Sequence, residues 1–187
     1  DVERGWVSFI NFQYVSDEKR TGEVNFNPKK DKGTTNIWGS EIVTDRIDTS
    51  IKLGYVFPEL PYRKISFQSA LSNHKQDSYF GLRDYTIAHR SVYSNLMYSS
   101  LIGDTRSTFK TGVSFTHDFY DELVISTSYS RTENAFGGFF EYTFDNLDEF
   151  SLTAGLRLDT HNLLGTFLTP RFHLRYVPWR KGVVKVA

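Results

Sequence analysis

The sequence predicts an all-β protein, an antiparallel up-and-down transmembrane β-barrel, and three observations support this fold class. Residues 139–176 read as three consecutive long strands whose side chains alternate between apolar and polar with almost no slips. Each predicted strand is about twice the usual 5 to 6 residues of soluble proteins, and about 9 to 11 tilted residues cross a bilayer as a barrel strand. The composition is rich in aromatic residues, with 16 Phe and 11 Tyr, which is unusual for a soluble core.

The same alternation, taken along the chain, predicts eight strands and the start of a ninth. Four of the connections are short and rich in Pro, Gly, Asp or Asn, as tight turns require, at 58–62, 103–105, 145–148 and 178–182. Three of the other connections, at 16–40, 76–88 and 118–132, read as longer polar or mixed loops, and only 162–166 is brief. Short turns at one end and long loops at the other are typical of outer-membrane barrels. The predicted strands are Arg4 to Val15, Glu41 to Phe57, Arg63 to Lys75, His89 to Ile102, Arg106 to His117, Glu133 to Phe144, Glu149 to His161 and Phe167 to Val177, with the ninth beginning at Val183.

The alternation also predicts which side chains share a face, because successive side chains of a strand point to opposite sides. We expect Glu141, Arg157 and Arg171 to face inward. We expect one outward apolar belt that consists of Phe140, Tyr142, Phe144, Leu152, Leu156, Leu158, Phe172 and Leu174.

Charge and motifs exclude several classes of function. Lys plus Arg equal Asp plus Glu at 22 each, so no net charge indicates nucleic acid as a partner. With no cysteine, a disulfide framework and thiolate chemistry are excluded. The apolar runs are far shorter than the 18 or so residues of a spanning helix. No signature of an enzyme, and no cofactor motif, is present. We therefore expect no catalytic residues and no cofactor.

A metal site is not expected either. Asp159 and His161 are two residues apart, a spacing that places both on one face of a strand. This pair lacks the third and fourth ligands that a metal site needs.

Several short segments resemble the barrel strands of TonB-dependent outer-membrane receptors. The run 155–159 (Gly-Leu-Arg-Leu-Asp), followed by His161-Asn162, Gly165, Thr169-Pro-Arg171, Tyr176 and Pro178, is similar to adjacent strands of these barrels. The segments 37–39, 54–58 and 77–83 are similar to receptors of this family from the Bacteroides group. The resemblance implies a barrel of about 22 strands with a plugged lumen in the bacterial outer membrane. Its partners would be membrane lipid, a plug domain and the TonB system. The activity it implies is import of a scarce nutrient, such as a metal chelate, cobalamin or a glycan.

We expect residues 1–187 to form one incomplete barrel segment of about eight to nine strands. We expect the plug domain and the C-terminal strands to lie outside these residues, because the first predicted strand begins at Arg4 and Lys185 to Ala187 look like the middle of a strand. Two alternatives remain open at this point. Eight strands can close alone as a small outer-membrane barrel, either porin-like or an enzyme. A soluble β-barrel binding protein is the second alternative, and the uncharged outward set at 47–57 counts against it.

Two groups of residues are candidates for binding. The predicted loop Gln76 to Ala88 contains Tyr79, Phe80, Arg83 and Tyr85, and aromatic rings with arginine suit planar ligands. The alternative is that Tyr79 and Phe80 anchor the loop or join an interfacial aromatic girdle. The second group would face the lumen, in contact with the plug domain or the substrate, unless it forms only a salt-bridged barrel wall. It consists of Arg157, Asp159, Arg171, His173 and Arg175.

Overall fold

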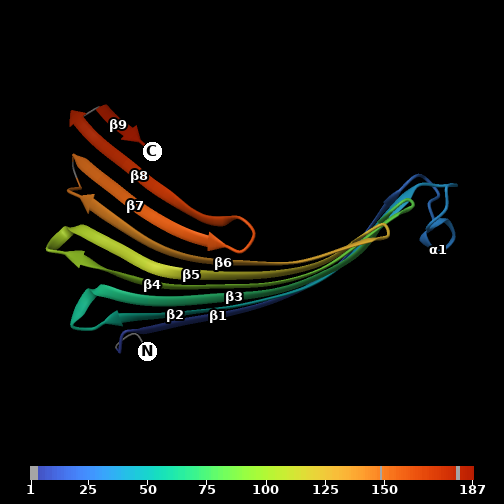
Figure 1. Ribbon diagram of the computed structural model, residues 1–187, viewed down its shortest axis with the longest axis horizontal. Coiled ribbons are helices and arrows are strands. Elements are labelled where there is room, and N and C mark those ends of the chain that lie inside the picture. The colour runs from blue at the N-terminus through green and yellow to red at the C-terminus, as the bar shows by residue number, and fades with distance from the viewer. Residues whose placement is uncertain (1–3, 148, 180–181) are drawn as a thin grey trace.

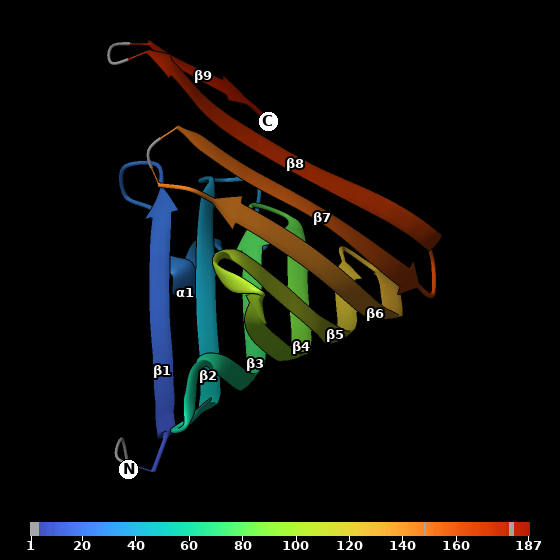
Figure 2. The same cartoon turned by 90° about the vertical axis from the view of Figure 1, so that its left-hand side faces the viewer.

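The computed structural model describes residues 4–147, 149–179 and 182–187. It is a single antiparallel sheet of nine strands in chain order (Figures 1 and 2). The predicted all-β, up-and-down architecture is therefore confirmed. The strands are β1 (Trp6–Gly22), β2 (Gly39–Phe57), β3 (Leu60–Phe80), β4 (Arg83–Ile102), β5 (Asp104–Val124), β6 (Thr127–Asp145), β7 (Phe150–His161), β8 (Gly165–Trp179) and β9 (Gly182–Val186).

The sheet is curved and open. Each strand pairs with its neighbours in sequence, and among the described residues β1 and β9 are not paired with each other. Figure 1 shows the tight turns together at the left, whereas the opposite ends of β1 to β6 reach far to the right. The β7–β8 hairpin ends well short of them. Among the described residues, no helix is both long enough and apolar enough to cross a membrane.

The strand registers place every residue on one of two faces, since residues opposite each other in a sheet share a face. One row crosses the sheet through Val7, Gly54, Ser66, Met97, Gly112, Phe139, Arg157 and Thr169. We call the face of this row the inner face, and the opposite face, which carries Phe140 and Leu156, the outer face. The predicted division of side chains between two faces is confirmed.

The outer face carries an apolar band that ends at nearly the same level on each strand. On β1 the outward residues are Trp6, Ser8, Ile10, Phe12 and Tyr14, followed by Ser16, Glu18 and Arg20. Beyond the band, the first polar outward residues on neighbouring strands are Asp45, Asn73, Arg90, His117 and Asn134. The band is comparable in height to the about 9 to 11 residues of a membrane-crossing barrel strand.

Aromatic rings line the edge of this band near the tight turns. Trp6 lies 4.9 Å from Tyr55, and Phe109 lies 5.8 Å from Tyr98 and 5.9 Å from Phe140, measured between ring centroids. Aromatic girdles at the membrane interface are a property of transmembrane barrels.

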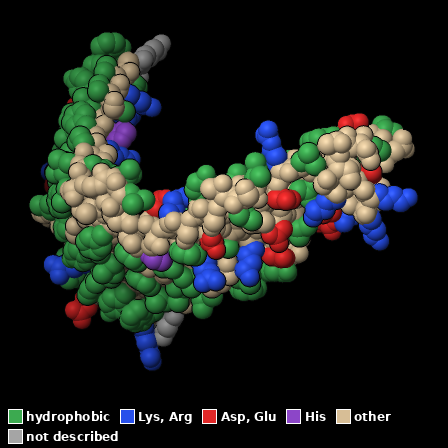
Figure 3. All heavy atoms as spheres, turned by 45° about the vertical axis from the view of Figure 1, so that its right-hand side comes forward, with side chains coloured by type: hydrophobic (Ala, Val, Ile, Leu, Met, Phe, Trp, Pro, Cys, Tyr) green, Lys and Arg blue, Asp and Glu red, His purple; other side chains and the backbone are tan. Residues whose placement is uncertain are grey.

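Two of the predicted long loops are in fact paired strands. Residues 76–88, expected to form a loop, belong to β3 and β4 and are joined by a two-residue turn at Gly81 and Leu82. Residues 118–132 belong to β5 and β6, which turn at Ile125 and Ser126. Gly81 and Ile125 both have positive φ, of 62° and 61°, as tight hairpin turns require. We call the paired segments beyond the apolar band (16–22, 39–45, 73–90 and 117–134) the extension. Figure 3 shows mixed charged side chains along this narrow end and hydrophobic ones over the broad end.

The third predicted long loop, now residues 23–38, packs on the outer face of the extension. It contains the short helix α1 (Pro28–Asp31), whose first turn is capped by the Asn27 side chain. The Phe26 ring lies against Gly22 and Gly39, at positions where a Cβ atom would overlap the ring. We call this segment the strap. Because its contacts with Gly22, Gly39 and Tyr79 lie on the outer face, the strap leaves the inner face open except at the tip, where Thr34 and Trp38 line a hollow with Phe80 and Arg83.

Candidate functional site

On the inner face, an ion pair of β7 reaches over a glycine of β6 to contact β5. The Arg157 guanidinium donates to both carboxylate oxygens of Asp159, at 2.6 and 2.7 Å, and to Ser114 Oγ at 2.7 Å. Asp159 is buried, with 7% of its surface exposed. The pair lies flat across Gly137, where a Cβ atom would overlap both side chains. Arg157 therefore links β7 to β5 across the intervening strand.

A second ionic group lies nearer the tight turns. Glu141 accepts from Arg171 at 3.1 Å and lies 3.8 Å from Lys110 Nζ. Arg171 also donates to His173 Nε2 at 3.0 Å. Arg175 follows on the same face of β8 and has no ion pair among the described residues. One carboxylate thus serves two cations, which leaves this part of the inner face positively charged.

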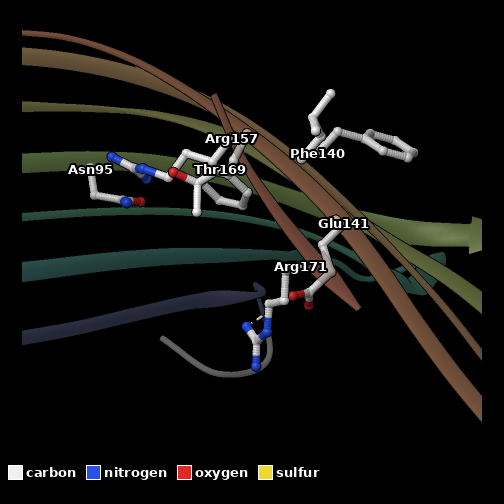
Figure 4. Close-up of a pocket in the computed structure, with 9 residues that line it drawn as sticks. Asn95, Phe140, Glu141, Arg157, Thr169 and Arg171 are labelled. Carbon is white, nitrogen blue, oxygen red and sulfur yellow. Dashed lines mark hydrogen bonds and ion pairs between the residues drawn. The ribbon is translucent and has the colours of Figure 1, made fainter. Parts of the chain in front are cut away.

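Between these two groups lies a hollow of about 340 Å³. Gly155, which lacks a side chain, lies two residues before Arg157 on β7 and opposite Arg171 on β8, and Phe139, Asn95 and Thr169 contribute to the lining of the hollow. Figure 4 shows Asn95, Arg157 and Thr169 grouped together, Glu141 beside Arg171, and Phe140 directed away from them. The five residues expected to face the lumen therefore lie on one face, but they form two groups with a gap between them.

No metal centre is formed by these residues. Asp159 is engaged by Arg157, and His161 Nδ1 accepts from the backbone N–H groups of Leu163 and Leu164. Across the described parts of the chain, no group of three His, Asp or Glu residues is arranged to hold a metal ion.

The four predicted loop residues are divided between the two faces. Phe80, Arg83 and Tyr85 lie on the inner face, whereas Tyr79 lies on the outer face beneath the strap. Tyr79 is only 3% exposed, and Lys32 Nζ lies 4.5 Å from its ring centroid. Its hydroxyl has no hydrogen-bond partner in the part of the chain that is described. Burial raises the pKa of Tyr79. Alternation along the strands places Tyr79 on the opposite face from the other three residues. The prediction of a loop at 76–88 did not anticipate this separation.

The inner face of the extension carries a network that the sequence reading missed. The Tyr120 ring stacks on His89, with centroids 4.3 Å apart and planes 6° apart, and Arg131 Cζ lies 3.9 Å from the same ring. His89 Nε2 is 3.0 Å from Asp118 Oδ1. Arg131 donates to Glu133 at 2.8 Å and to Glu122 at 3.1 Å.

The pKa values of Tyr120, of Arg131 and of the nearby Tyr85 are raised by their surroundings. Burial, followed by the negative charge of Asp118, raises the pKa of Tyr120. Burial, followed by the charge of Glu122, raises the pKa of Tyr85. Hydrogen bonds to Glu133 and Glu122 raise the pKa of Arg131. In the sequence, Tyr120 and Glu122 are two residues apart, and so are Arg131 and Glu133. This spacing was a signal of the network, but it can be recognised only after these segments are assigned to strands.

Comparison with solved structures shows the fold. The chain superposes on the unliganded ferric citrate transporter FecA with a TM-score of 0.57 and 14% identity, over 96% of this chain and 32% of the FecA chain. The chain therefore spans about a third of that protein. Weaker likenesses are found to the copper transporter OprC (TM-score 0.39, 10% identity, 89% and 42% covered). A mutant ferric enterobactin receptor PfeA from Pseudomonas aeruginosa gives a TM-score of 0.35, 11% identity and 94% and 38% coverage. No family model and no curated protein matches the sequence.

Proposed function

We propose that this chain forms part of the wall of an outer-membrane β-barrel receptor that imports a scarce nutrient. The observation that carries the proposal is the outer apolar band, which ends at nearly the same level from β1 to β6. A continuous apolar band on one face and a charged wall on the other suit a barrel between lipid and an aqueous lumen. The likeness to a transporter over 96% of the chain supports the same reading.

The partners follow from the proposed architecture. A plug domain would occupy the lumen against the Glu141–Arg171 group, and the TonB system would supply energy from the inner membrane. The nutrient would be a metal chelate, cobalamin or a glycan. His89 and Asp118 form the only described His–Asp pair of the extension. The surroundings of this pair favour transport over catalysis. No serine hydroxyl among the described residues is hydrogen-bonded to the His89 imidazole, as a nucleophile would be.

The soluble alternative is disfavoured by the outer face. Ile10 and Phe12 are 71% and 67% exposed, and they belong to a continuous apolar surface of the kind that soluble monomers do not expose.

The experiment uses the full-length protein in a Gram-negative host that lacks its own receptors for the probes. Cells take up labelled ferric citrate, cobalamin or short neutral oligosaccharides, with and without a protonophore that collapses the inner-membrane gradient. We expect the protein to fractionate with the outer membrane, and uptake of one probe to stop when the gradient collapses. Recovery in the soluble fraction, or uptake that is indifferent to the protonophore, would contradict the proposal.

A further inference from the structure

The extension rises beyond the apolar band, and its inner face is open to the aqueous side. The strap is packed on the opposite face, over Gly22, Gly39 and Tyr79. Tyr129, on the inner face of β6, is 53% exposed. A ligand that approaches the proposed barrel from outside would meet this wall first.

The cations of this wall are already engaged by carboxylates. Lys19 lies 2.9 Å from Asp17, and on the same face, next to the extension, Arg46 donates to Asp48 at 2.7 and 3.0 Å. Arg131 is shared by two carboxylates, Glu122 and Glu133, whose side chains are 19% and 29% exposed. The one described cation on this wall without an ion pair is Arg83, at the tip.

This charge pattern disfavours a ligand with several negative charges. An anionic chelate would have to displace an existing ion pair and would meet the excess carboxylate of Glu122 or Glu133, since charge complementarity determines which partners are excluded. The same groups suit a ligand with many hydroxyls. Carboxylates accept charge-assisted hydrogen bonds from hydroxyl groups, and an exposed tyrosine ring offers an apolar surface with a polar tip.

We infer that the inner face of the extension, at Tyr129, Tyr85, Glu122 and Glu133, is a binding surface for a neutral ligand rich in hydroxyl groups, of the oligosaccharide class. This inference rests on the proposed receptor function and narrows its ligand to one of the three classes. Tyr120, held between His89 and Arg131, positions Glu122 and Glu133 through Arg131 rather than contacting the ligand itself.

The test measures binding to the purified full-length protein in detergent, by calorimetry. The probes are a panel of short neutral oligosaccharides of different linkage, with ferric citrate as the anionic probe. We expect one oligosaccharide to bind and ferric citrate not to bind. Glu122→Gln and Tyr129→Ala should each weaken that binding about tenfold, the equivalent of about 1.4 kcal/mol.

Asp121→Asn is the matched control. Asp121 is adjacent to Glu122 at the same height, but it lies on the outer face, so the control should bind as the unmodified protein does. Equal losses of oligosaccharide affinity in Glu122→Gln and Asp121→Asn would overturn the inference. Binding of ferric citrate, or a failure of every oligosaccharide to bind, would also overturn it. Binding to the purified protein does not depend on the energised membrane. A protein that binds an oligosaccharide without energised uptake therefore contradicts the proposed function and leaves the ligand class supported.

Discussion

Charged residues on the inner face differ in how extensively ion pairs and hydrogen bonds hold their side chains. From alternation alone, Arg157 and Arg171 are equivalent charged residues on a solvent-exposed face. The structure separates them, because Arg157 neutralises the buried Asp159 and reaches Ser114, whereas the Arg171 side chain is 62% exposed and shares Glu141 with Lys110. The difference comes from Gly137, whose missing side chain lets Arg157 lie flat.

The two faces should therefore respond in opposite ways to charge. Leu156→Arg, on the outer face, should cost about 2 to 4 kcal/mol because it places a cation in the apolar band. Arg171→Leu should cost much less. Arg157→Leu should lie between them, since it leaves Asp159 buried without its cation. Denaturant titration of the full-length protein in lipid gives the change in the free energy of unfolding for each of the three variants. A smaller cost for Leu156→Arg than for Arg171→Leu would reverse the assignment of the faces.

The hydroxyl group of Tyr79 is not expected to contribute to stability. This hydroxyl is buried and has no hydrogen-bond partner among the described residues, and an unsatisfied buried group costs about 1 to 3 kcal/mol. Tyr79→Phe should therefore leave stability unchanged or raise it, by thermal unfolding of the full-length protein. Tyr85→Phe is the control of the same chemistry on the inner face. A clear loss of stability in Tyr79→Phe alone would show that the hydroxyl is satisfied.

At the scale of elements, the strands were predictable only where one face is apolar. Alternation located each strand across the band, for example β2 as far as its end at Phe57. It failed at 76–88 and 118–132, because both faces of the extension mix polar with apolar side chains there and no alternation remains to be read. The hydrogen bonds of the ladder hold these strands together regardless of side-chain polarity. The strap and the network around Tyr120 depend on contacts between strands and could not be inferred from spacing in one strand.

The strap should be released by a single added side chain. Gly39→Val would overlap the Phe26 ring and should detach residues 23–38 from the outer face. Lys29, Lys30 and Lys32 would then be cleaved by trypsin at lower concentrations than in the unmodified protein. Gly54→Ala is the control, because its nearest neighbouring atom would lie at an ordinary contact distance of 3.8 Å. Identical cleavage in the Gly39→Val protein and the control would contradict the packing of Phe26.

The short β7–β8 hairpin should contact lipid at its turn. Its Leu163 and Leu164 are 61% and 75% exposed, and the turn follows directly after the outward Leu158 and Thr160. An environment-sensitive fluorophore attached to a cysteine in Leu163→Cys should therefore report an apolar environment in lipid vesicles. The same label in Leu82→Cys, at the turn of the tall β3–β4 hairpin, should report water. Equal spectra at the two turns would show that the hairpins end at the same height.

At the scale of the whole molecule, the two faces of one curved sheet meet different solvents in the proposed barrel wall. Sequence patterning was enough for this feature, because alternation across a band is a property of residues adjacent in sequence. The open edges at β1 and β9, the height difference between hairpins and the position of the strap arise from the assembled sheet. The likeness to about a third of a transporter chain agrees with a wall that belongs to a larger barrel.

The most direct test of this division is a spin-label scan along β7 of the full-length protein in lipid. The chain contains no cysteine, so single cysteines at successive positions 154 to 159 can each carry a label. Labels at 154, 156 and 158 should be accessible to oxygen, which concentrates in lipid, and labels at 155, 157 and 159 to a water-soluble relaxation agent. Accessibility that alternates between the two agents with this phase is the predicted result. Uniform access of the water-soluble agent at all six positions would contradict a membrane-spanning wall.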